Sequence, residues 1–200
     1  MQLVIASGNK GKLAEFKAMF ELDEVELRPQ SDFGVADIEE TGHTFIENAL
    51  LKARHAALIS GVPALGDDSG LCVDALGGSP GLLSARYGGV HGDATRNIGR
   101  LLRELDGVEQ GKRTARFHCV LVLLRHAADP QPLIAEGSWE GRILTEPRGD
   151  GGFGYDPVFL DLESGLSAAE IAPSLKNRLS HRGRALAVMK QQLQSRLVSS

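Results

Sequence analysis

The sequence predicts an α/β fold with a mixed, twisted sheet and flanking helices. Apolar strands alternate with helices early in the 200-residue chain, and the middle of the chain is rich in strands. The sequence shows no internal repeat and no disordered linker. We therefore expect one domain over residues 1–200, built as two lobes around a central cleft.

The first part of the chain predicts strand, helix, strand and helix in that order. Residues 3–6 form a short apolar run, and apolar residues at helical spacing follow between 13 and 20. Residues 25–27 read as a second strand. The segment Thr44-Phe-Ile-Glu47 fits a capping box, which predicts a helix that ends near Gly61. Alanines on one face of this helix indicate close packing against the sheet.

The rest of the chain predicts further strands and two helices. Apolar residues 64–66 and 71–73 lie on either side of Asp67-Asp-Ser-Gly70, where we expect a glycine-bearing turn. Residues 97–105 read as an amphipathic helix. Residues 117–124 and 133–139 read as neighbouring strands of a hairpin or meander, and a helix is expected from about 181 to 197.

Composition excludes several classes of function. The formal net charge of −4 argues against a nucleic-acid polymer as partner, because such proteins usually carry a basic surplus. The six histidines lack the spacing of a zinc site. No segment reads as a signal peptide or approaches the roughly 20 apolar residues of a membrane span, so we expect no membrane association and a cytoplasmic location.

The segment Ser7-Gly8-Asn9-Lys10-Gly11-Lys12 is a candidate phosphate site. It follows a strand and begins a helix, where free backbone amides and two lysines would attract an anion. The P-loop pattern fails at Ala6 and at Leu13, where it requires glycine and a hydroxyl residue. An ordinary strand-to-helix turn explains the segment equally well.

Two acidic stretches are candidates for a magnesium site. Mg²⁺ takes one or two carboxylates and leaves its other positions to water and substrate phosphates. Glu40 and Asp68 could supply those carboxylates. Because Asp-rich turns also form for purely local reasons, spacing alone does not decide between the two interpretations.

Two segments near the C-terminus could hold a nucleoside. Lys176 could contact phosphate, and His181 and Arg182 could donate hydrogen bonds to a base carbonyl, although a solvated basic helix is the common alternative. Phe153 lies between glycines in Gly152-Phe-Gly154-Tyr155-Asp156, and an aromatic ring in such a loop could stack on a base. Packing back onto the core is an equally good explanation.

Together these segments resemble the inosine triphosphate pyrophosphatase family, also called XTP/dITP diphosphatases. Six motifs occur in the family's order: Ser7-Gly-Asn-Lys-Gly-Lys12, Glu39-Glu-Thr-Gly-His-Thr-Phe-Ile-Glu-Asn-Ala49, Asp67-Asp-Ser-Gly-Leu71, Pro80-Gly81 with Ser84-Ala-Arg86-Tyr87, Gly152-Phe-Gly-Tyr-Asp-Pro157 and Ser180-His-Arg-Gly183. The one departure is Gly66, where the family pattern leads us to expect alanine.

The resemblance implies a magnesium-dependent enzyme that hydrolyses inosine and xanthosine triphosphates and their deoxy forms to monophosphate and pyrophosphate, usually as a homodimer. Asp68 would activate water and bind Mg²⁺ together with Glu40. By the same carry-over the triphosphate would be held by Ser7, Gly8, Asn9, Lys10, Gly11, Lys12, Lys52 and Ser69. The nucleoside would be held by Phe153, Gly154, Tyr155, Asp156, Lys176, His181 and Arg182, and Asp67 would support the site.

Two alternatives stay open. One is a pyrophosphatase for modified pyrimidine nucleotides on a similar fold, which a substrate panel would separate. The other is a nucleotide sensor without catalysis, against which the carboxylates of Glu40 and Asp68 count.

Overall fold

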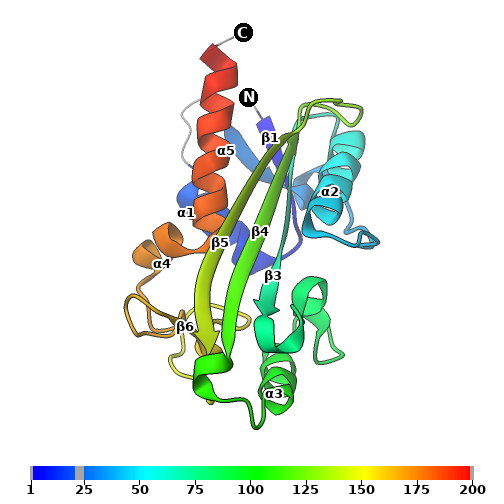
Figure 1. Ribbon diagram of the computed structural model, residues 1–200. Helices are drawn as coiled ribbons and strands as arrows, with labels where there is room; N and C mark the ends of the chain where they lie inside the picture. Colours follow the sequence, from blue (N-terminus) through cyan, green and yellow to red (C-terminus); the bar gives the residue numbers. More distant parts are fainter. Residues whose placement is uncertain (1, 21–24, 199–200) are drawn as a thin grey trace. The chain divides into compact units, whose positions relative to one another are not determined.

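The computed structural model describes residues 2–20 and 25–198, apart from the side chains of residues 197 and 198 (Figure 1). The described residues form a six-stranded sheet in the order β2-β1-β3-β4-β5-β6. The strands are β1 (Gln2–Ala6), β2 (Glu26–Pro29), β3 (Ala64–Val73), β4 (Thr114–Leu124), β5 (Leu133–Ile143) and β6 (Phe159–Asp161). The helices are α1 (Lys10–Met19), α2 (Phe45–Ser60), α3 (Ala94–Glu104), α4 (Pro173–Leu179) and α5 (His181–Val198).

The sheet is mixed, as predicted. Strand β1 pairs in parallel with both β2 and β3, whereas β5 pairs antiparallel with β6. The chain divides into two compact units: unit 1 comprises Met1–Asp68, Cys119–Gly137 and Arg182–Ser200, and unit 2 comprises Ser69–His118 and Ser138–His181. No helix within residues 2–20 and 25–198 is long and apolar enough to cross a membrane. The predicted α/β class is confirmed, and the central cleft stays a prediction.

Unit 1 has three layers, with its part of the sheet between helices (Figure 1). Helices α1 and α5 cover one face, where the buried core includes Leu3, Ile5, Phe16, Leu65, Cys119, Leu121, Leu186 and Met189. Helix α2 covers the other face through Ala49, Ala53, Ala56 and Ala57, which pack near Val4, Ala64, Val120 and Val122. Within unit 1, odd-numbered residues of β1, β3 and β4 therefore face α1 and α5, and even-numbered residues face α2.

Local sequence explains where the first two helices begin. The Asn9 side chain accepts a hydrogen bond from the Lys12 amide at 3.1 Å and caps α1. The predicted capping box is present in α2, because Thr44 Oγ1 accepts from the Glu47 amide at 3.2 Å and Glu47 accepts from the His43 amide at 2.8 Å. Gly61, at a φ of 71°, ends α2 in the left-handed conformation that glycine favours.

Glycine at position 66 has a packing reason. A β-carbon at this position would lie 2.9 Å from the Ala53 backbone nitrogen and would also collide with the Ala49 carbonyl. Strand β3 therefore lies directly against the small residues of α2, as the alanine face predicts. This close contact explains why glycine occupies position 66, where alanine was expected.

Unit 2 is built around a cluster of aromatic side chains. The ring centres of Phe117 and Phe159 lie 4.5 Å apart, and those of Trp139 and Phe159 lie 5.1 Å apart. The buried indole of Trp139 donates to Asp161 at 2.9 Å, so its polar atom is satisfied within the core. Helices α3 and α4 contribute Leu101, Leu175 and Leu179 to this cluster.

Three predictions about elements were wrong or incomplete. Asp67-Asp-Ser-Gly70 is not a turn but the middle of β3. These residue types favour turns through local hydrogen bonds, yet here the two carboxylates form ion pairs on the two faces of the strand and leave the backbone in the sheet. Strand β5 continues past 139 to Ile143, and neither α4 nor β6 was predicted as an element of its own.

Candidate functional site

The predicted phosphate segment forms the expected turn between β1 and α1. Gly8, Asn9 and Lys10 are exposed, and the Asn9 amide donates to Ser7 Oγ at 3.2 Å. A β-carbon at Gly8 would lie 2.6 Å from the Asp37 carboxylate, so a larger residue at this position would require the Asp37 side chain to move. An exposed first turn of a helix with a lysine in it is a suitable anion site.

Lys12 lies in a buried ion cluster in unit 1. Its ammonium forms an ion pair with Asp67 Oδ1, and Arg182 Nε donates to Asp67 Oδ2 at 3.1 Å. The guanidinium of Arg182 also pairs with Glu15, and the Cys119 thiol donates to Asp67 Oδ2 at 3.3 Å. Burial alone would raise the pKa of Asp67, but the charges of Lys12 and Arg182 outweigh it and hold that pKa well below its usual range.

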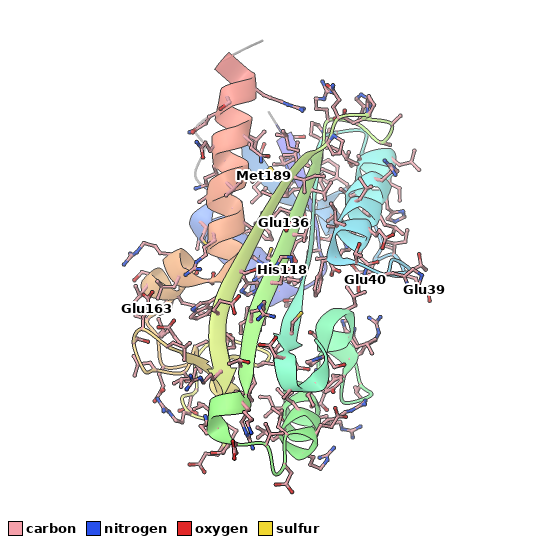
Figure 2. All side chains as sticks on the ribbon, in the orientation of Figure 1. Glu39, Glu40, His118, Glu136, Glu163 and Met189 are labelled. Carbon is pink, nitrogen blue, oxygen red and sulfur yellow. The ribbon has the colours of Figure 1, made fainter. Side chains whose placement is uncertain are left out.

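A second ion cluster lies on the α2 side of β3. Lys52 Nζ contacts Glu40 Oε1 at 2.7 Å and Asp68 Oδ1 at 3.0 Å. The Asn48 amide nitrogen donates to Asp68 Oδ2 at 3.2 Å. Glu40 and the exposed Glu39 lie on the loop that precedes α2 (Figure 2). This cluster brings together the two carboxylates and the lysine that the sequence predicted.

Burial sets the acidity of Asp68. Desolvation raises the pKa of Asp68 above its ordinary value, and the nearby Glu40 adds to the increase, while Lys52 and Lys12 oppose it. Burial would lower the pKa of Lys52, but the charges of Asp68 and Glu40 raise it overall. Asp67 and Asp68 are adjacent in sequence and have opposite pKa shifts, because they face different sides of the strand.

The predicted nucleoside residues of unit 2 form a third group. Lys176 is buried and contacts Asp156 Oδ2 at 2.6 Å, so it is not part of a solvated basic helix. The same carboxylate oxygen accepts from the Phe153 amide at 2.7 Å, and the Lys176 ammonium lies 5.1 Å from the centre of the Phe153 ring. The Phe153 side chain is 38% exposed, so the ring is not packed into the core.

The remaining predicted residues have different surroundings. Tyr155 is buried in the unit 2 core, and its hydroxyl donates to the Ser84 carbonyl at 2.9 Å. The His181 ring stacks on Phe117 at 4.9 Å between ring centres. Arg182 belongs to the Asp67 cluster of unit 1, as described above, whereas Ser69 lies on β3 within unit 2.

Sequence reasoning missed Asn48, Glu15 and Cys119. Asn48 lies inside the motif around Glu47, and Glu15 lies three residues after Lys12 on the same helix, but neither spacing identifies a partner on another element. Among the described residues, no group of three or more His, Cys, Asp or Glu side chains is placed to hold a metal ion. Within the described residues, a metal ion could therefore take at most two ligands from these four residue types.

Comparison with known proteins gives consistent matches along the chain. A model of the Ham1 family matches residues 3–192. The chain is 60% identical to the dITP/XTP pyrophosphatase of Xylella fastidiosa (strain 9a5c), over 92% of this chain and 93% of that protein. It is 57% identical to the dITP/XTP pyrophosphatase of Thioalkalivibrio sulfidiphilus, over 98% of this chain and 100% of that protein.

Solved structures of Ham1 and dITP/XTP pyrophosphatase proteins are also similar to this chain. A HAM1 protein from Coxiella burnetii superimposes with a TM-score of 0.88 at 46% identity, with 100% of both chains covered. A nucleoside-triphosphatase/dITP/XTP pyrophosphatase from Mycobacterium abscessus superimposes with a TM-score of 0.74 at 41% identity, over 94% of this chain and 97% of that chain.

Proposed function

Because this chain belongs to the Ham1 family, we propose that it is a nucleoside-triphosphate pyrophosphatase that hydrolyses non-standard purine nucleotides, namely inosine and xanthosine triphosphates and their deoxy forms. The products would be the nucleoside monophosphate and pyrophosphate. The observation that carries the proposal is the pairing of Asp67 with Lys12 and of Asp68 with Lys52 on adjacent residues of β3. Two cations and two carboxylates of this kind suit the binding and hydrolysis of a polyphosphate.

The carboxylates of Glu40 and Asp68 fit a magnesium ion. Both contact the ammonium of Lys52, so their oxygens already converge on a positive charge. Two carboxylates are the number that Mg²⁺ commonly takes from a protein when substrate phosphates and water fill the other positions. When bound there, Mg²⁺ would supply neutralisation of the phosphate charge and greater acidity of a bound water.

Unit 1 residues would hold the triphosphate. The amides of residues 8–11 at the start of α1, together with the Ser7 hydroxyl, would donate to phosphate oxygens, and the Asn9 amide would exchange its bond to Ser7 Oγ for one to phosphate. The ammonium groups of Lys12 and Lys52 would exchange part of their contact with Asp67 and Asp68 for phosphate oxygens. Each charge-assisted hydrogen bond to phosphate would contribute roughly 1.5–3 kcal/mol. Ser69 does not belong to unit 1, and its role as a further hydroxyl donor to phosphate rests on the family resemblance alone.

Asp68 would act as the general base. Its carboxylate would orient a water molecule, remove a proton from it, and direct the resulting hydroxide at the α-phosphorus, which releases pyrophosphate in one displacement. Burial raises the pKa of Asp68, and a more basic carboxylate is a better proton acceptor as long as it stays ionised at working pH. The ammonium of Lys52 favours that ionised form.

Unit 2 residues would recognise the nucleoside. The half-exposed ring of Phe153 would stack on the base, with Lys176 and Asp156 fixing the loop of Gly154 and Tyr155 behind it. His181 would donate to the 6-keto oxygen of a deaminated purine. The 6-amino group of adenine would leave that donor unpaired, and sites of this kind reject the wrong partner by about 10⁴-fold or more.

A direct contact of Arg182 with the base stays a prediction. The guanidinium is 2% exposed and bonds to Asp67 and Glu15. Arg182 would in either case keep Asp67 ionised, because its positive charge lowers the pKa of that carboxyl.

The proposal is tested by a panel of purine and modified pyrimidine triphosphates with and without Mg²⁺, scored separately for pyrophosphate and orthophosphate. We expect pyrophosphate from inosine and xanthosine triphosphates, no activity after chelation, and little turnover of ATP. Orthophosphate as the first product, or preference for a modified pyrimidine, would refute the assignment. Binding without any product would indicate a sensor instead.

The family resemblance also supports a homodimer that works on the nucleotide pool of the cytoplasm. Light scattering on the purified protein tests the dimer, since a dimer would have twice the chain mass of 21.4 kDa. Cell fractionation tests the location.

A further inference from the structure

Asn48 connects the loop before α2 to the carboxylate of Asp68. Its side chain is buried, and its amide nitrogen donates to Asp68 Oδ2 at 3.2 Å. Its amide oxygen accepts from the Gly42 backbone N–H at 2.8 Å. Both ends of one buried amide are therefore engaged, one with the loop and one with the strand.

The two partners fix the orientation of this amide. The Gly42 N–H can only donate, so it requires the amide oxygen of Asn48. An ionised carboxylate can only accept, so Asp68 requires the amide nitrogen. Gly42 allows the close approach, because a β-carbon there would lie 2.6 Å from Asn48 Oδ1. The two contacts agree, and a flipped amide would lose both.

The two oxygens of Asp68 are thus held by different donors. Asn48 holds Oδ2, and the ammonium of Lys52 holds Oδ1 at 3.0 Å. Two donors on two oxygens fix the plane of a carboxylate, which one donor cannot do. We infer that Asn48 is a positioning residue that keeps the Asp68 carboxylate in the orientation required to direct a water molecule at the α-phosphorus. This inference rests on the proposed function.

The chain contains a matched control for a purely structural asparagine. Asn97 is the fourth residue of α3, as Asn48 is the fourth residue of α2, and both side chains are buried. Asn97 Oδ1 accepts from the Gly88 N–H at 2.6 Å, and its amide nitrogen donates to the Ala85 carbonyl at 3.2 Å. The same loop-to-helix connection therefore exists in unit 2, with a backbone carbonyl in place of a carboxylate.

The decisive variant is Asn48→Asp. It keeps an acceptor for the Gly42 N–H and replaces the donor to Asp68 with an oxygen that repels it. We expect kcat for inosine triphosphate to fall roughly 10- to 100-fold, since small misplacements of a catalytic group have effects of this size. KM should stay within about threefold, because Asn48 makes no contact that is proposed to bind substrate. Asn97→Asp should leave both constants within about threefold of the parent.

An asparagine that only anchors the loop would give a different result. In that case Asn48→Asp would keep the hydrogen bond from the Gly42 N–H and would show the parental kcat, which would overturn the inference. Asn48→Ala removes both bonds without adding charge, so it should lower kcat to the same extent. Circular dichroism melting curves establish that each variant folds at the assay temperature.

Crystal structures of the parent and the Asn48 variants provide a measurement that does not depend on turnover. We expect Asp68 to rotate and to lose its contact with Lys52 in Asn48→Asp and Asn48→Ala. An Asp68 carboxylate in its parental orientation in both variants would refute the positioning role. A parent protein that releases no pyrophosphate would refute the proposed function alone, and the orientation of Asp68 would still decide the role of Asn48.

Discussion

Asp67→Asn should destabilise the protein strongly, because it removes a carboxylate that pairs with the buried cation of Arg182. The guanidinium of Arg182 is 2% exposed and cannot regain water, and only Glu15 among the ion pairs described above would remain to it. Lys12 is 16% exposed, so its ammonium can turn toward solvent. Removing one partner from a buried pair costs about 3–5 kcal/mol, and because Lys12 can turn toward solvent, we expect a loss of about 3 kcal/mol.

A loss of this size is easy to measure. For a chain of about 200 residues, 1 kcal/mol corresponds to a shift of about 2–4 °C in Tm, so Asp67→Asn should melt about 6–12 °C lower at pH 7. Urea titration followed by circular dichroism gives the free energy of unfolding independently. The double variant Asp67→Asn with Arg182→Met removes both charges of the Arg182–Asp67 pair, so its loss of stability should be smaller than the sum of the two single losses.

The pH dependence has a definite sign. Because the folded pKa of Asp67 is depressed, its contribution is fully present above the unfolded pKa of about 3.9 and is lost as the pH falls through the folded value. The difference between parent and Asp67→Asn should therefore be constant near neutral pH and shrink below about pH 4. Asp161→Asn is the control, since Asp161 is buried and accepts from the neutral donors Trp139 and Ser164. A loss below about 1 kcal/mol in Asp67→Asn, or one no larger than in the control, would refute the reasoning.

Three further predictions follow from the site and the fold. Asp68→Asn should keep nucleotide binding and lower kcat by at least about 100-fold in a pyrophosphate-release assay, because an amide cannot accept the proton from water. Phe153→Ala should raise KM by roughly 5- to 100-fold through lost stacking of about 1–3 kcal/mol, whereas Phe153→Trp should restore most of the affinity. Asp129→Asn should lower the free energy of unfolding by about 1–3 kcal/mol at pH 7, since the Asp129 carboxylate accepts from the Arg125 guanidinium and from backbone amides. Hydrogen bonds from Arg125 depress the pKa of Asp129, so this loss should fade below about pH 4. Parental melting of Asp129→Asn at neutral pH would contradict this.

The sequence predicted best those features that depend on neighbouring residues. The capping box of Thr44 and Glu47 lies within four positions, so the start of α2 could be predicted from the letters alone. The turn before α1 likewise depends on Gly8 and Asn9. Motifs in the family's order located Glu40 and Asp68, and the resemblance added Lys52; the structure brings the three together.

Features that depend on distant partners were not predictable in this way. The stretch from Asp67 to Gly70 has the composition of a turn, but ion pairs with Lys12 and Lys52 keep it in the sheet. The sequence left a solvated basic segment open as an alternative for Lys176, because its partner Asp156 lies 20 positions earlier. A buried polar residue is defined by what surrounds it, and single-sequence patterns carry little of that information.

The position of the acidic pair within a strand, rather than in a turn, explains how two adjacent carboxylates acquire different chemistry. Side chains of a strand alternate between faces, so Asp67 points toward the Lys12 and Arg182 charges, and Asp68 points toward α2 and Lys52. The first carboxyl has a lowered pKa and serves as a fixed counter-ion, while burial raises the pKa of the second, which suits a base. A shift of one residue in the register of β3 would exchange the two environments. The packing of Gly66 against α2 opposes such a shift, because any other residue brought to that position would collide with the helix backbone.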